Sequence, residues 1–132
     1  MGEIYTKSLL ESYIKLEDET LRDSYKSFEN SMFRQAANSA YYAMFYSANA
    51  ALISAGVKLP KTHKSVVSSF SNYYVRTGKL DRKFSRYLNE APSVRLASTY
   101  EVVISPNKSD VEKVMYNAQE FVNVVRKIVY FK

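Results

Sequence analysis

A run of 23 residues without charge, positions 35–57, limits what this sequence can fold into more than any other feature. Its centre, residues 40–53, reads AYYAMFYSANAALI. The run is long enough to span a bilayer, but polar side chains are spread along it and strongly apolar ones are few, which opposes burial in lipid. A helix that is small and apolar nearly all round is typical of the buried centre of a helical bundle.

The other segments predict an all-α fold, an up-and-down bundle of about five helices forming one domain over residues 1–132. Turn and capping signals place the helices at about 4–28, 32–55, 62–77, 81 onward and 109–130. Gly56 is the expected C′ glycine of the second helix. Thr62, Asp81 and the capping box beginning at Ser109 are the expected N-terminal caps. Pro92 is expected to kink or interrupt the fourth helix, and residues 104–107 form a loop.

The first and last helices are predicted to be amphipathic. In the first, a stripe that includes Leu16, Leu21 and Tyr25 faces the core, while the acidic residues Glu17, Asp18, Glu19 and Asp23 lie on the solvated side. In the last, the apolar face comprises Val111, Val114, Met115, Ala118, Phe121, Val122, Val125 and Val129.

Composition excludes several classes of site. The chain has no cysteine, so disulfides and zinc sites built from thiolates are excluded. The first residues lack the basic-then-apolar order of a secretory signal, and we therefore expect a cytoplasmic protein. P-loop, dinucleotide-binding and nucleophile-elbow motifs do not occur, and no metal or other cofactor is expected.

Positive charge is concentrated in one part of the chain. Residues 58–95, here called the basic segment, carry nine basic and two acidic groups, whereas residues 1–57 carry five basic and seven acidic groups. A partner that bears phosphates would be drawn to the basic segment. The alternative is a solvated basic face without a ligand.

Four motifs together resemble those of a known family. They are NSAYYAMF at 38–45, GVKLPKTH at 56–63, VRTGKLDR at 75–82 and RLASTY at 95–100. In this order and spacing they resemble the HEPN domains, in particular the small stand-alone prokaryotic type. The resemblance covers nearly the whole chain and implies a helical bundle that is usually a homodimer.

The resemblance also implies a range of activities. Many HEPN domains are ribonucleases that need no metal, and others bind RNA, nucleotides or partner proteins. Small members are often encoded beside a minimal nucleotidyltransferase, as a toxin–antitoxin pair. The nuclease motif is Arg followed, after four to six residues, by His. Arg neutralises the charge that builds on the scissile phosphate, and His transfers a proton.

In this chain the motif begins at Arg95, but the position that follows after four intervening residues is Tyr100. The resemblance implies that this Arg-x4-Tyr form is a feature of the stand-alone subgroup. Relatives often have Ala-Asp immediately before the Tyr, whereas this chain has Ser98 and Thr99. The only histidine is His63. Arg95, Tyr100 and His63 are therefore the candidate catalytic residues. The structural alternatives are an ion pair for Arg95, packing for Tyr100 and a hydrogen bond that holds a loop for His63.

Two functions remain open. The first is a module that binds RNA, a nucleotide or a nucleotidyltransferase partner, and the second is a metal-independent ribonuclease acting through Arg95 and Tyr100. Most rings of the second helix are expected in the core, although one tyrosine could stack on a base. The candidate binding residues are Lys61, Lys64, Arg76, Lys79, Arg82, Arg86, Tyr42 and Asn38.

Overall fold

The computed structural model describes the backbone of residues 2–100 and 107–130, and the side chains of residues 6–91 and 107–130. Five α-helices and one π-helical segment occur in these ranges, and they contain no strand. The elements are α1 (Gly2–Glu29), α2 (Phe33–Ser54), α3 (His63–Phe70), η1 (Ser71–Val75), α4 (Lys83–Tyr100) and α5 (Lys108–Tyr130). The predicted all-α fold is confirmed.

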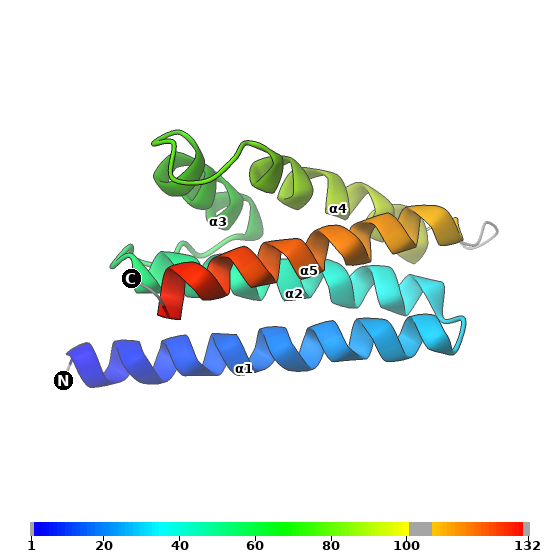
Figure 1. The fold of residues 1–132 in the computed structure, drawn as a ribbon, viewed down its shortest axis with the longest axis horizontal. Coiled ribbons are helices and arrows are strands. Elements are labelled where there is room, and N and C mark those ends of the chain that lie inside the picture. The colour runs from blue at the N-terminus through cyan, green and yellow to red at the C-terminus, as the bar shows by residue number, and fades with distance from the viewer. Residues whose placement is uncertain (1, 101–106, 131–132) are drawn as a thin grey trace.

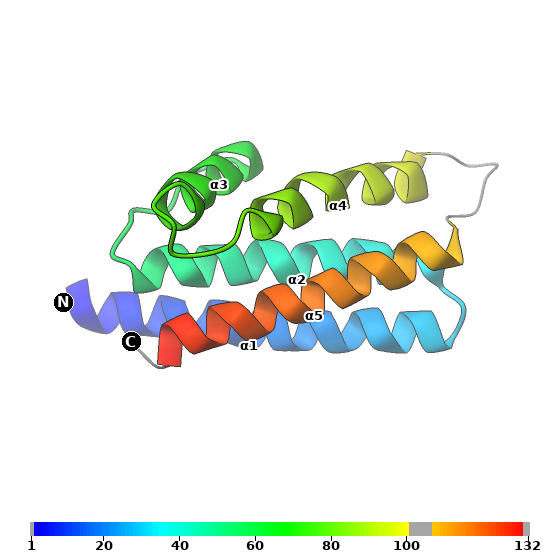
Figure 2. The same ribbon diagram turned by 45° about the horizontal axis from the view of Figure 1, so that its top comes forward.

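Helix α2 lies at the centre of the bundle. It packs against α1, α3, α4 and α5, and among the described residues α1 contacts neither α3 nor α4. Figures 1 and 2 show α1 and α2 as a long antiparallel pair, α5 running along α2, and α3 and α4 forming a layer on the far side of α2 from α1. The first turn of α1 and the last turn of α5 lie at the same end of the bundle (Figure 1).

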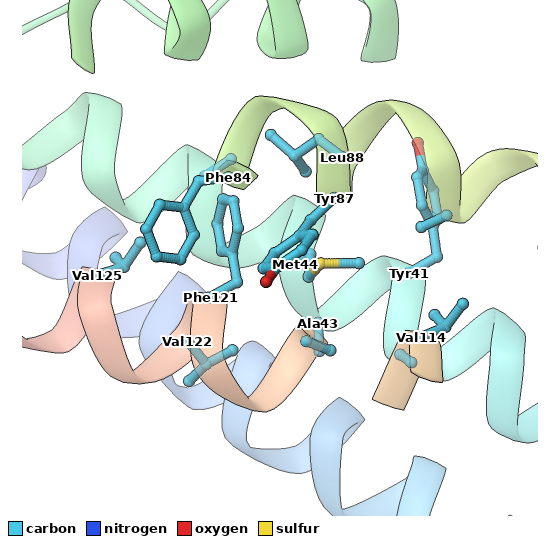
Figure 3. Close-up of a cluster of buried hydrophobic side chains, with 14 of the residues drawn as sticks. Tyr41, Ala43, Met44, Phe84, Tyr87, Leu88, Val114, Phe121, Val122 and Val125 are labelled. Atoms are coloured by element: carbon cyan, nitrogen blue, oxygen red, sulfur yellow. The ribbon is translucent and has the colours of Figure 1, made fainter. Parts of the chain in front are cut away.

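The side chains of α2 explain this central place. Seven alanines of the helix are almost wholly buried, at positions 36, 37, 40, 43, 48, 50 and 51. Because these side chains are small, neighbouring helices approach closely, and larger residues such as Met44 fill the space between them. Figure 3 shows Met44 among Tyr87 of α4 and Phe121 of α5. The prediction of a buried centre is confirmed, and no helix in the described ranges is long and apolar enough to cross a membrane.

The ends of α2 and α3 follow the predicted signals. Gly56 has a φ of +77°. Its backbone N–H donates to Ile53 and that of Val57 to Leu52, each at 3.0 Å, which is the Schellman pattern. At the start of α3 the Thr62 hydroxyl accepts a hydrogen bond from the Ser65 N–H at 3.0 Å. The segment between these two caps brings the chain back along α2.

Three expectations about helix ends need correction. The third helix turns into a π-helix at Ser71–Val75, where the Arg76 N–H donates to the Ser71 carbonyl at 2.9 Å. Helix α5 begins at Lys108, one residue before the predicted capping box, because the Asn107 side chain accepts a hydrogen bond from the Ser109 N–H at 2.8 Å. Helix α4 continues through Pro92, so the predicted interruption does not occur, whereas a kink at Pro92 stays a prediction. Of the predicted 104–107 loop, residues 104–106 lie outside the described residues.

The placement of Glu17 on the solvated side was also wrong. Its side chain is 0% exposed, whereas Leu16 and Tyr25 of the predicted apolar stripe are each 39% exposed. Arg126 of α5 lies with its Nε 3.5 Å from the Glu17 carboxylate and also pairs with Asp18. Burial raises the pKa of Glu17 to about 7, and the Ser47 hydroxyl and the Arg126 charge oppose this rise only in part.

This buried carboxylate should make stability fall as pH rises. Glu17 binds its proton more tightly in the folded chain than in the unfolded chain, where its pKa is 4.5. The stabilisation is therefore complete below that value and is lost as pH rises through about 7, a change of roughly 3 kcal/mol. Urea unfolding of Glu17→Gln between about pH 5 and pH 8 should show a flatter dependence than wild type.

The matched control is Glu19→Gln, because Glu19 is an exposed acid on the same helix. It should keep the pH dependence of the wild type. An unchanged dependence in Glu17→Gln would show that Glu17 is not the group responsible.

Candidate functional site

The only histidine of the chain lies against the aromatic residues of α2. The centroid of the His63 ring is 4.2 Å from that of Phe45, 5.9 Å from that of Tyr42 and 6.3 Å from that of Tyr41. The Tyr41 hydroxyl oxygen lies 3.5 Å from Nδ1 of His63. This placement follows from the loop after α2, which returns the chain to the middle of that helix before α3 begins.

We call this group the His63 aromatic cluster, and its members are His63, Tyr41, Tyr42, Phe45 and Tyr46. Adjacent rings of α2 contact one another, with Tyr41 and Tyr42 centroids 5.1 Å apart and those of Phe45 and Tyr46 6.0 Å apart. Tyr41 is buried, whereas Tyr42, Phe45 and Tyr46 are partly exposed and His63 is exposed. The cluster therefore has a packed base and an edge that solvent reaches. Only Tyr41 is fully part of the core.

Two of the predicted phosphate-binding residues flank this cluster. Lys61 and Lys64 are exposed and lie within two residues of His63. They stand at the N-terminus of α3, where the helix dipole also favours an anion. The cluster and its two lysines combine accessible aromatic edges with positive charge on one part of the surface.

The other predicted cations lie elsewhere. Arg76 and Lys79 follow η1, at the far end of the helical segment that begins with His63, whereas Arg82 directly precedes α4. The hydroxyl oxygens of Ser71 and Ser85 lie 2.7 Å apart, so the start of α4 returns to the end of α3. The Lys79 ammonium lies 4.0 Å from the centroid of the Tyr73 ring. On α4, Arg86 pairs with Glu90 at 3.5 Å. The exposed cations of the basic segment are therefore distributed over the start of α3, the turn after η1 and the first turns of α4.

The motif residues Arg95 and Tyr100 belong to the last turns of α4, and their side chains lie outside the described residues. Their backbone position is informative, because α4 packs against α2 and runs antiparallel to it (Figure 1). The end of α4 that carries the motif therefore lies toward the N-terminal half of α2. Asn38, a partly exposed candidate, is on that half and precedes Tyr42 by one helical turn.

Comparison with known proteins identifies the family to which this arrangement belongs. The model of the HEPN domain matches residues 11–128. The chain belongs to the HEPN domain family. The predicted resemblance is confirmed, and the match extends from the middle of α1 to the last turn of α5.

Several curated proteins are similar to this HEPN chain. Two come from Methanocaldococcus jannaschii. "Putative toxin MJ0605" is 30% identical over 89% of this chain and 87% of its own length, and "Putative toxin MJ0142" is 28% identical over 98% and 88%. A "UPF0332 protein" of Thermotoga maritima is 24% identical over 93% of this chain and 92% of its own.

In the described residues, no three His, Asp or Glu side chains are grouped so that they could hold a metal ion. The close contact between His63 and Phe45 was missed by reasoning from the sequence. The motifs NSAYYAMF and GVKLPKTH, which contain Phe45 and His63, indicated the family but predicted no contact between these two residues. A signal was nevertheless present, because the short loop 55–62 ends in a capping threonine and so must bring the next helix close to α2.

Contact between the two rings can be measured as a coupling free energy. In a double-mutant cycle, Phe45→Leu and His63→Ala should be non-additive by about 0.5–1 kcal/mol, because each variant removes one ring of the pair. The measurement is the free energy of unfolding in urea for the wild type, both single variants and the double variant.

Lys64→Ala in place of His63→Ala gives the control cycle, since Lys64 is the next residue and has no ring. That cycle should be additive within about 0.3 kcal/mol. Equal coupling in both cycles would mean that the His63 ring does not stabilise Phe45.

Proposed function

We propose that this HEPN protein is the toxin-type member of a pair and that it binds single-stranded RNA at the His63 aromatic cluster. One observation carries the proposal: Lys61 and Lys64 are exposed and lie within two residues of His63, whose exposed ring contacts Phe45 and Tyr42. Lysines attract the phosphate backbone regardless of sequence. Aromatic edges and faces supply the stacking contacts that single-stranded bases use.

The partners follow from the same proposal. Two relatives are named as toxins, which supports a toxin–antitoxin pair for this chain. The resemblance of its motifs to those of small stand-alone HEPN proteins supports a minimal nucleotidyltransferase as the second member. It also supports a homodimer, in which the motif ends of two α4 helices would form one cleft. Arg76, Lys79 and Arg82 then extend the path of the RNA away from the cluster.

Removing both lysines should weaken RNA binding strongly. We expect Lys61→Ala/Lys64→Ala to bind a short single-stranded oligonucleotide about tenfold or more less tightly than the wild type at low salt. The slope of log K against log[salt] should become less negative, by about 0.7 for each phosphate that the variant no longer neutralises. Fluorescence anisotropy over a salt series gives both quantities.

Lys7→Ala/Lys15→Ala is a matched control. It removes the same charge from exposed positions on α1, on the other side of α2 from α3 (Figure 2). It should leave binding within about twofold of the wild type. Equal losses in the two double variants, or no binding to RNA at low salt, would rule out this site.

A second function, cleavage of RNA, is supported by the motif at the end of α4 and by the toxin names of the relatives. Arg95 would neutralise charge on the scissile phosphate. Tyr100 or His63 would transfer the proton that the family motif assigns to histidine. This chemistry requires no metal ion.

Cleavage is tested with purified protein and labelled RNA in the presence of EDTA. If the protein is a ribonuclease of this kind, cutting persists and Arg95→Ala abolishes it. Tyr100→Phe should slow cutting by about 100-fold or more if the hydroxyl transfers a proton, and should have little effect if the ring only packs. His63→Ala tests in the same way whether the imidazole transfers a proton. Binding without any cleavage leaves the RNA-binding function alone.

A further inference from the structure

A second concave site lies between α4 and α5, over the middle of α2. It has a volume of about 280 Å³. A nucleobase fits in this space, which is slightly smaller than the roughly 300–1,000 Å³ of typical small-molecule pockets. Its lining residues are Met44, Tyr87, Glu90, Ala91, Asp110, Lys113, Val114 and Asn117.

The floor of the pocket is apolar and contains one amide. Met44, Ala91 and Val114 are each at least 94% buried. The Tyr87 hydroxyl donates a hydrogen bond to Glu120 at 2.8 Å, so Tyr87 presents mainly its ring (Figure 3). Asn117 is only 9% exposed and lines the pocket, so its amide adds a hydrogen-bond donor and an acceptor to the apolar floor.

The rim carries charge of both signs. Glu90 and Asp110 bring carboxylates from α4 and α5, and Lys113 brings an ammonium one turn after Asp110. All three are exposed. Carboxylates only accept hydrogen bonds, an ammonium only donates them, and an amide does both. The pocket therefore offers acceptors at the rim beside donors from Lys113 and Asn117.

Among the bases, guanine has the edge that matches this arrangement. Its N1–H and N2–H₂ are adjacent donors that a carboxylate accepts together, and its O6 is an acceptor beside them. The corresponding edge of adenine presents one donor, N6–H₂, and one acceptor, N1. One oxygen of a facing carboxylate would therefore have no donor from adenine. An apolar floor suits the flat face of a purine.

We propose that the pocket between α4 and α5 binds a guanine base, with Glu90 or Asp110 accepting from N1–H and N2–H₂ and Lys113 or Asn117 donating to O6. The inference deepens the proposed RNA binding and rests on it. Arg95 follows Ala91 by one helical turn on α4, so a base held in the pocket places its phosphate near the motif helix. The pocket would then select which nucleotide of the RNA lies beside the motif.

The test compares ligands that differ in one base. Octamers of uridine with a single central guanosine or adenosine are titrated by anisotropy, and guanosine and adenosine monophosphates are titrated by calorimetry. The wild type should prefer the guanine member of each pair by about tenfold. Glu90→Gln/Asp110→Asn should bind both members equally, because an amide cannot accept both guanine donors.

Glu11→Gln/Glu112→Gln is the matched control, since it removes two exposed acidic charges that do not line the pocket. It corrects for the general gain in RNA affinity that follows loss of negative charge, and it should keep the preference for guanine. Circular dichroism checks that both double variants fold.

The outcomes separate this inference from the proposed function. RNA binding without a guanine preference in the wild type, or a preference that survives Glu90→Gln/Asp110→Asn, overturns the guanine pocket and leaves RNA binding intact. A preference for guanosine monophosphate that this variant abolishes supports the pocket, even if the uridine octamers do not bind and the RNA function fails.

Discussion

Burial of the uncharged helix α2 is the interaction on which the rest of this molecule depends. Seven alanines let the neighbouring helices pack closely around it, and the larger side chains of α4 and α5 complete the core. Every site considered above uses α2 as its base. The His63 aromatic cluster lies on one part of α2, and the guanine pocket has Met44 of the same helix in its floor.

Most of the fold is predictable from the sequence because its signals are local. The charge-free run, Gly56 and Thr62 each act within a few residues, and they placed α2 and the start of α3 correctly. Failures arose where a distant residue decides the outcome. Glu17 is a charged residue of a type that usually lies on the solvated surface. It is buried because α5 crosses α1 and brings Arg126 to it. Such a pairing has no local signature.

The candidate site was predictable only as a set of residue types. The family motifs contain His63, and the uneven charge pointed to Lys61 and Lys64. The structure places His63 against the partly exposed rings of α2, with the two exposed lysines within two residues of it. Uneven charge along the chain identified the basic segment but not the elements that carry its cations. Their positions depend on the path of the chain through α3, η1 and the start of α4. The pocket between α4 and α5 also joins residues that are distant in the sequence, with Asn117 as its least obvious member.

The π-helical turn at Ser71–Val75 has a consequence for comparing this chain with its relatives. Each residue of an α-helix advances the side-chain direction by about 100°, so a turn that contains one extra residue rotates the helical residues that follow it by that angle. Tyr74 is buried, and its hydroxyl donates a hydrogen bond to the Ala51 carbonyl at 2.5 Å. These contacts of Tyr74 fix the orientation of the π-helical turn. In a relative with one residue fewer here, the segment would be an ordinary helix, and the residue corresponding to Arg76 would point in a different direction. An alignment gap at this turn would therefore mark a change in the direction of surface charge, although the packed core before it would be the same.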